Sequence, residues 1–163
     1  MALKPITPNG MLKDINDNFA AVAPVGVDDG LGALRVARFT FDAGVAGNRP
    51  VGAHGTGVTL PANAIIVGGF FDVNTPFTGE TNATLAIHVQ AANDIQAAAA
   101  VSGAPFSTIG RKAIVPKANT PESTSVKTTV AREITCTVAT AALLTGKLTG
   151  YLYFVEGVLS SAG

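Results

Sequence analysis

The clearest strand pattern in the sequence is Ala83-Thr84-Leu85-Ala86-Ile87-His88-Val89-Gln90, in which large apolar side chains alternate with small or polar ones. Successive side chains of a β-strand point to opposite faces. Leu85, Ile87 and Val89 are therefore predicted to face a core, and His88 is interpreted as an outward-pointing strand residue. This alternation predicts a half-buried β-strand.

Comparable patterns recur along the chain on both sides of this strand. In residues 34–41 one face holds Ala37, Phe39 and Phe41, and in residues 133–140 one face holds Ile134, Cys136 and Val138. Further strands are predicted at residues 64–73, where the pair Gly68-Gly69 predicts a bulge or bend, and at 113–115, 125–130 and 146–156. Seven or eight strands joined by turns predict a mainly β domain, either a β-sandwich or a jelly roll.

The last of these strands differs from the others because both of its faces are apolar. Leu148, Leu152 and Phe154 share one face, and the opposite face holds Tyr151, Tyr153 and Val155. A strand of this kind is either covered by another element or buried at a subunit contact. Tyr151, Tyr153 and Val155 are therefore candidate subunit-interface residues.

One short helix is predicted within this β-rich region. Asn93 or Asp94 is suited to the N-cap position, and the residues up to Ala100 are rich in alanine, which favours helix formation. Gly103 is suited to the C-terminal end of such a helix.

Residues 1–32 are predicted to form an N-terminal arm, and residues 33–163 a β-sandwich domain. The arm is punctuated by proline and glycine, but its apolar residues recur at helical spacing between these breaks: Met11, Ile15, Phe19 and Val22. A helix this short needs a surface to pack against. That surface is either the chain's own domain or a neighbouring subunit, so Met11, Ile15 and Phe19 join the candidate interface residues.

The composition favours a protein that assembles. Hydrophobic residues make up 47% of the chain and charged residues 13%, and the formal net charge is zero. An ordinary soluble domain has about 25% charged residues, and low charge favours association between copies. A monomer with a neutral, threonine-rich surface is the alternative interpretation.

The same composition argues against several other classes of protein. Lysine and arginine are scattered, so no basic patch for direct nucleic-acid binding is expected. No apolar run approaches the roughly 20 residues that span a bilayer, and the first residues lack a signal-peptide pattern, so synthesis in the cytoplasm without membrane insertion is expected. The single cysteine excludes an intrachain disulfide and a cysteine-based metal cluster.

A search for catalytic patterns finds none. His54 and His88 have no second ligand at metal-binding spacing, and His54 is interpreted as a solvated turn residue in a glycine-rich loop. Cys136 lies on an apolar strand face and is interpreted as a buried hydrophobic residue. Neither a nucleophile elbow nor a phosphate-binding glycine loop occurs. We therefore predict no enzyme activity, no catalytic residue, no cofactor and no metal ligand.

Two stretches resemble a known family of virus proteins. The first is residues 60–73 (LPANAIIVGGFFDV), with residues 84–87 and 91–100, and the second is residues 126–138 (VKTTVAREITCTV), with residues 144–147 and 151–155. Over roughly residues 33–156, the chain is similar to small capsid decoration (cement) proteins of tailed double-stranded DNA bacteriophages. The similarity is confined to short sequence segments, so it does not identify functional residues in this chain.

This resemblance implies a β-sandwich that forms homotrimers on the outer capsid surface, at three-fold and quasi-three-fold positions. Such a protein would clamp neighbouring major capsid proteins, and it would be located in the virion after assembly in the host cytoplasm. Its expected partners are therefore other copies of itself and the major capsid protein.

Other functions compete with this interpretation. Within a virion, the chain could be a single jelly-roll coat protein or a head-fibre or tail module. Outside a virion, a carbohydrate-binding β-sandwich is less favoured, because tryptophan is absent and aromatic residues are only 6% of the chain.

Overall fold

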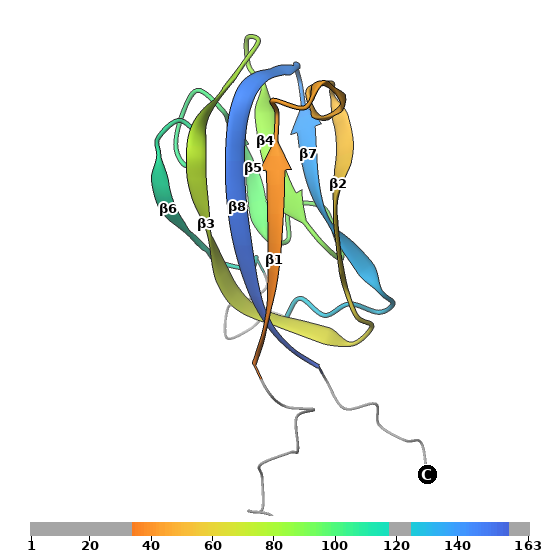
Figure 1. Cartoon of the computed structure of the whole chain (residues 1–163). Coiled ribbons are helices and arrows are strands. Elements are labelled where there is room, and N and C mark those ends of the chain that lie inside the picture. The colour runs from red at the N-terminus through yellow and green to blue at the C-terminus, as the bar shows by residue number, and fades with distance from the viewer. Residues whose placement is uncertain (1–33, 118–124, 157–163) are drawn as a thin grey trace, which may run out of the picture. The chain divides into compact units, whose positions relative to one another are not determined.

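A computed structural model of the chain describes residues 34–117 and 125–156 (Figure 1). The predicted arm, with Met11, Ile15 and Phe19, lies outside the described residues. Within them the structure is mainly β and contains a single 3-10 turn, η1 (Ala46–Asn48). No helix of this part of the chain has the length and apolarity needed to cross a membrane.

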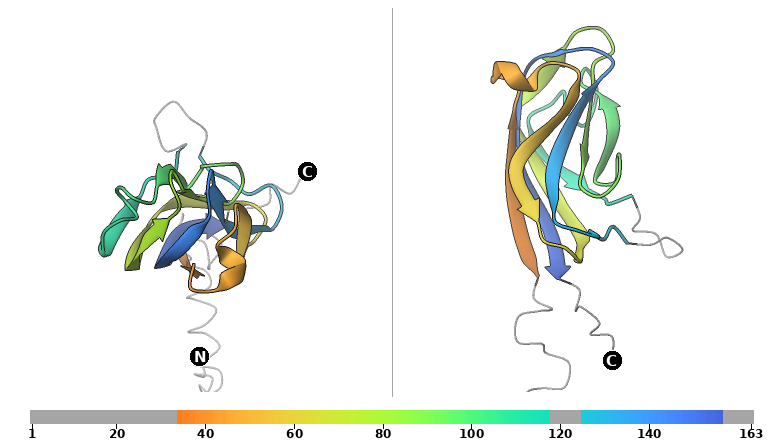
Figure 2. Two further views of the ribbon diagram at one scale, coloured as in Figure 1. Left: turned by 90° about the horizontal axis from the view of Figure 1, so that it is seen from above. Right: turned by 90° about the vertical axis from the view of Figure 1, so that its right-hand side faces the viewer.

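The strands form two antiparallel sheets of four strands each, which lie face to face (Figures 1 and 2). The first sheet has the order β1-β8-β3-β6 and the second the order β2-β7-β4-β5. The strands are β1 (Arg35–Asp42), β2 (Gly52–Leu60), β3 (Ala64–Gly79), β4 (Thr84–His88), β5 (Gln96–Ala100), β6 (Gly110–Ile114), β7 (Arg132–Ala139) and β8 (Leu143–Glu156).

The strand order is that of a jelly roll. The first strand pairs with the eighth, the second with the seventh, the third with the sixth and the fourth with the fifth. Only β4 and β5, which are consecutive in sequence, lie in the same sheet, so every other connection crosses between the sheets. Eight strands wound in this way form the double-sheet jelly roll, which confirms the predicted β-sandwich.

The core lies between the two sheets and is formed by the residues that alternate inward. The inward faces predicted for β1, β4, β7 and β8 are all buried, and Cys136 is a fully buried free thiol. The largest buried side chains are aromatic: Phe39, Phe41, Phe71, Phe77 and Phe106. The predicted irregularity at Gly68-Gly69 is a β-bulge, because the register of β3 against β8 shifts between Ile66 and Gly68.

The helix predicted up to Ala100 is wrong, because residues 96–100 form β5. This strand pairs with β4, and Thr84 lies opposite Ala100. Asp94 does not cap a helix but is buried, and its carboxylate accepts hydrogen bonds from the backbone N–H groups of Val89, Gln90 and Ala91. Helix propensity, even that of alanine, differs between ordinary residues by less than about 1 kcal/mol per residue and is routinely overridden by tertiary context. Here the pairing of residues 96–100 with β4 overrides it.

Two further predictions need correction. The glycine-rich segment around His54 is not a loop but the first half of β2, and His54 is partly buried with its Nε2 atom 2.8 Å from the carbonyl oxygen of Pro50. Residues 125–130 form no regular strand and make one isolated bridge, between Ile65 and Lys127.

Candidate subunit interface

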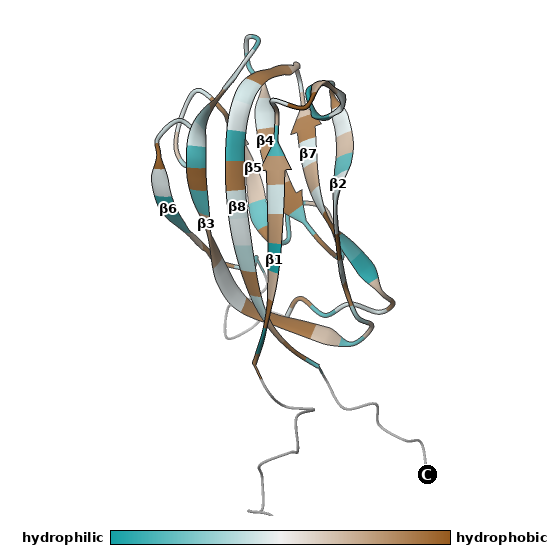
Figure 3. Cartoon of the chain, viewed as in Figure 1, coloured by the Kyte–Doolittle hydropathy of each residue, from teal (hydrophilic) through white to brown (hydrophobic). Residues whose placement is uncertain are grey.

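The outer face of the β1-β8-β3-β6 sheet presents the apolar residues that the sequence singles out. In β8, Leu148, Leu152 and Phe154 point into the core. The alternate residues Tyr151, Tyr153 and Val155 therefore lie on the outer face, and all three are partly buried. Figure 3 colours the ribbon by residue hydropathy and shows hydrophobic and hydrophilic residues alternating along the strands of this sheet.

The pairing of β8 with β1 and with β3 places residues of both strands beside these side chains. Val36 of β1 lies opposite Tyr153, and its side chain is well exposed, with 56% of the residue accessible to solvent. Phe70 of β3 lies opposite Tyr151. We call these five residues the aromatic patch: Val36, Phe70, Tyr151, Tyr153 and Val155.

The aromatic rings of the patch pack against one another. The ring centroids of Phe70 and Tyr151 are 4.8 Å apart in a stacked arrangement, and Tyr153 meets Phe70 edge-on at 6.1 Å. From β6 the guanidinium carbon of Arg111 lies 4.2 Å from the Phe70 centroid. Aromatic pairs and cation–π contacts of this geometry are each worth about 1 kcal/mol, so they hold the rings in place before any partner binds.

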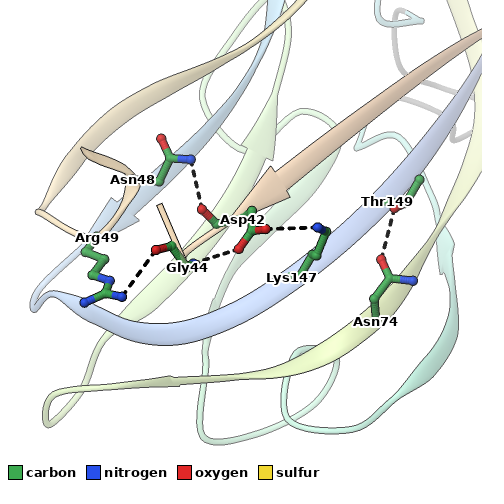
Figure 4. A network of polar contacts seen from close by, with 7 residues as sticks. All are labelled: Asp42, Gly44, Asn48, Arg49, Asn74, Lys147 and Thr149. Carbon is green, nitrogen blue, oxygen red and sulfur yellow. Dashed lines mark hydrogen bonds and ion pairs between the residues drawn. The ribbon is translucent and has the colours of Figure 1, made fainter. Parts of the chain in front are cut away.

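Paired charges border the patch toward one end of the sheet. Arg111 forms an ion pair with Asp72, with a distance of 3.2 Å between Nε and Oδ1, and this contact raises the pKa of Arg111. Lys147 Nζ lies 3.0 Å from Asp42 Oδ2, and Thr149 donates a hydrogen bond to Asn74 (Figure 4). These cations are therefore already matched by carboxylates of the same chain.

Asp42 also organises the loop that follows β1 (Figure 4). Its Oδ1 atom accepts a hydrogen bond from the Gly44 N–H at 2.7 Å, and its carbonyl accepts one from Asn48. Arg49 donates to the carbonyl oxygens of Ala43 and Gly44. The bond to Lys147 and, after it, the bond to Gly44 hold the pKa of Asp42 below its ordinary value.

The cation without an ion pair on this face is Arg38. It lies opposite Tyr151 in the register, is exposed, and forms no ion pair with any residue that the structure describes. The outer face of this sheet thus combines the aromatic patch, the two ion pairs that border it, and the positive charge of Arg38. Tyrosine, phenylalanine and arginine are the residue types that are enriched where proteins bind one another.

Potential metal ligands do not cluster in the part of the chain that the structure describes. No group of three or more His, Cys, Asp or Glu residues lies close enough to hold a metal ion there. His88 Nδ1 lies 3.3 Å from the Thr137 hydroxyl on the outer face of the other sheet. Burial raises the pKa of the Cys136 thiol, which keeps it in the neutral, unreactive form.

The sequence located part of this surface and missed the rest. Alternation in β8 identified Tyr151, Tyr153 and Val155 as a second apolar face. Val36, Phe70 and Arg111 were not singled out, because their proximity depends on the pairing of β1, β3 and β6, which are far apart in sequence.

Comparison with known proteins finds similar folds among solved structures but no match by sequence. No protein-family model matches this sequence, and a comparison with curated protein sequences finds no significant match. Similar solved structures do exist. A chain in the capsid of Ralstonia phage GP4 has a TM-score of 0.53 and 19% identity, over 82% of this chain and 90% of that chain.

Two other phage capsids contain similar chains. One belongs to the capsid asymmetric unit of cyanophage Pam1, with a TM-score of 0.54 and 18% identity over 83% of this chain and 92% of that one. The other belongs to the acid-stable capsid of Helicobacter pylori bacteriophage KHP30, with a TM-score of 0.51 and 12% identity over 78% and 91%. At these identities the likeness establishes a shared fold.

Proposed function

We propose that this chain is a structural protein of a phage virion, which binds the outer capsid surface as a homotrimer and stabilises contacts between major capsid proteins. One observation supports this above the others. The jelly-roll fold is shared with chains of three different phage capsids, over 78% or more of this chain and 90% or more of each of theirs. Jelly rolls also serve in lectins, so the capsid origin of all three is what favours a virion role.

The aromatic patch supports self-association. Its rings lie on a sheet face that has few unmatched charges, and the whole chain has a net charge of zero. Oligomers of identical chains commonly have closed cyclic symmetry, and a three-fold arrangement would bury one such patch in each contact. Tyr151, Tyr153 and Val155 are the residues that we assign to this contact.

A stabilising role does not require strong individual contacts. A capsid presents many equivalent sites, and a trimer that touches several capsid subunits at once gains affinity through multivalency. Modest contacts from each copy would then be enough to hold neighbouring capsid proteins together.

Binding to capsids tests this function directly. Heads are prepared from the phage that encodes this chain after deletion of its gene, and the purified 163-residue chain is added in increasing amounts. We expect the chain to sediment with the heads up to a plateau, and the heads to withstand a higher temperature before they release DNA. Failure to sediment with intact heads would contradict the proposal.

A single jelly-roll coat protein is the competing virion role. A coat protein would form shells without a preformed capsid, whereas a decoration protein would remain a small oligomer until heads are added. The mass of the purified chain separates these two functions.

A further inference from the structure

We propose that the open edge of β6 binds an extended, acidic segment of another protein, which adds to the first sheet as a fifth strand. The inference rests on the proposed function, under which the other protein is the major capsid protein. In the order β1-β8-β3-β6, the described strand beside β6 is β3, and β6 lies at the edge of the sheet (Figure 1). The backbone groups on its other side, here called the open edge, are therefore available to a further strand.

The other edge strands of the described domain are covered or protected. β1 and β2 are edges on the same side of the sandwich, and there they contact each other. The register of β5 against β4 shifts along its length, and side chains bond the backbone of β5. Asn93 Oδ1 accepts a hydrogen bond from the Ala98 N–H, and the Gln96 amide donates one to the Ala97 carbonyl. Irregular pairing and covering groups of this kind hinder further strand pairing.

The charges of β6 select the kind of strand that can pair with it. Arg111 and Lys112 are adjacent in this five-residue strand, so a second β6 at the open edge would bring cations close to cations, which is unfavourable. Arg111 is already paired with Asp72. The ammonium group of Lys112 donates a hydrogen bond to the Thr108 hydroxyl and forms no ion pair with any described residue. An acidic partner segment would supply the missing negative charge.

Apolar surface continues from the aromatic patch to the open edge. Ala113 of β6 lies opposite Phe70, so it shares the outer face of the sheet with the patch, and it is exposed. Ile109 and Val115 flank β6 and are 68% and 73% exposed. An added strand would cover part of this surface. The trimer contact assigned to β8 lies two strands away, or about 10 Å, so the same copy can make both contacts.

Hydrogen exchange of the backbone amides tests the added strand. An antiparallel edge strand leaves every second N–H group without a partner strand, so these amides exchange fast until a strand is added. The natural chain is measured alone and bound to heads that lack it, by mass spectrometry of peptides that cover β6. Peptides that cover β5, the edge strand of equal length in the other sheet, are the control. We expect exchange in β6 to slow by about ten-fold on heads, and exchange in β5 to stay unchanged.

Three other results would overturn the inference in different ways. A chain that sediments with the heads while β6 exchanges as fast as before would exclude the added strand and leave the proposed function standing. Slow exchange of β6 in the purified chain would show that the chain itself, or a second copy, already fills the open edge. A chain that does not sediment with the heads would contradict the proposed function as well.

A charge reversal tests the acidic character of the partner segment. Lys112→Glu is compared with Arg132→Glu, which makes the same change of charge at an exposed residue of β7, in the other sheet. Circular dichroism verifies that both variants fold, and sedimentation with heads gives their Kd values. We expect Lys112→Glu to raise the Kd by about ten-fold and Arg132→Glu by less than about two-fold. Equal effects of the two substitutions would overturn an acidic contact at β6.

Discussion

Phe70 is the residue at which the apolar and charged parts of the outer face meet. Tyr151 stacks on it from β8, and Arg111 lies over its ring from β6 while pairing with Asp72. The chain itself therefore holds Phe70 from both neighbouring strands. A partner would add its contacts mainly to Val36, Tyr153 and Val155, which have fewer neighbours of this kind.

Asp42 is a residue whose ionisation makes the free energy of unfolding depend on pH. Its folded pKa is held below the ordinary value of 3.8 by Lys147 and Gly44. A carboxyl group whose pKa is lower in the folded than in the unfolded protein stabilises the fold when the pH is above its unfolded-state pKa. This stabilisation is lost as the pH falls through the folded-state pKa. Asp42→Asn should therefore lower the free energy of unfolding at pH 7 by up to about 1 kcal/mol, as is usual for an exposed pair.

Urea denaturation at pH 7 and near pH 2.5 measures this effect. The difference between Asp42→Asn and the natural protein should shrink as Asp42 becomes protonated. A difference that is as large in acid as at neutral pH would mean that the charge of Asp42 is not the cause.

At the scale of the strands, alternation predicted the elements whose inward residues are large. β1, β4, β7 and β8 each place large apolar residues at every second position, and all were predicted. β5 was not, because Gln96–Ala100 is nearly all alanine and has no large residue to reveal a period of two. β2 was missed because glycines occupy three of its nine positions, and glycine is typical of turns.

The candidate interface was predictable only along one strand. Tyr151 and Tyr153 were identified from their own strand, since alternation is a local property. The stacking of Phe70 and the position of Arg111 follow from the order β8-β3-β6, and strand order depends on how the whole chain winds. The residues of the arm lie outside the described structure, so their place in the interface stays a prediction.

Gly150 shows how closely β8 packs on β1. It lies opposite Phe39, and a Cβ atom added at Gly150 would collide with the Phe39 ring. Overpacking of a buried site typically costs 1–3 kcal/mol. Gly150→Ala should therefore lower the free energy of unfolding by about 2 kcal/mol, as measured by urea denaturation.

Gly68→Ala is the matched control for this substitution. Gly68 lies on β3 in the same sheet, and a Cβ atom there would meet no other atom within 4 Å. Its effect should stay within about 0.5 kcal/mol. If the two substitutions had equal effects, contact between Gly150 and Phe39 would not limit the packing of this sheet.

At the scale of the whole molecule, the two outer faces of the sandwich can be compared by the same kind of substitution. The pair Tyr151→Asp and Tyr153→Asp places two charges on the aromatic patch. The pair Thr135→Asp and Thr137→Asp places two charges at the same spacing on β7, in the opposite sheet. Both pairs of side chains are partly buried on outer faces.

We expect the tyrosine variant to dissociate into folded monomers, because burying carboxylates in an apolar contact is costly. The threonine variant should keep the mass of the natural protein. Circular dichroism verifies that both variants fold, and light scattering gives their masses. A folded tyrosine variant with an unchanged mass would show that the patch is not the contact between copies.

The mass of the purified chain in solution, measured by light scattering over a range of concentrations, shows whether the chain forms the proposed trimer. The chain has a mass of 16.4 kDa, so we expect a stable species of three copies, about 49 kDa, that does not grow into larger particles. A shell-sized particle would identify a coat protein instead. A monomer at every concentration would contradict the proposed trimer and the contact assigned to its aromatic patch.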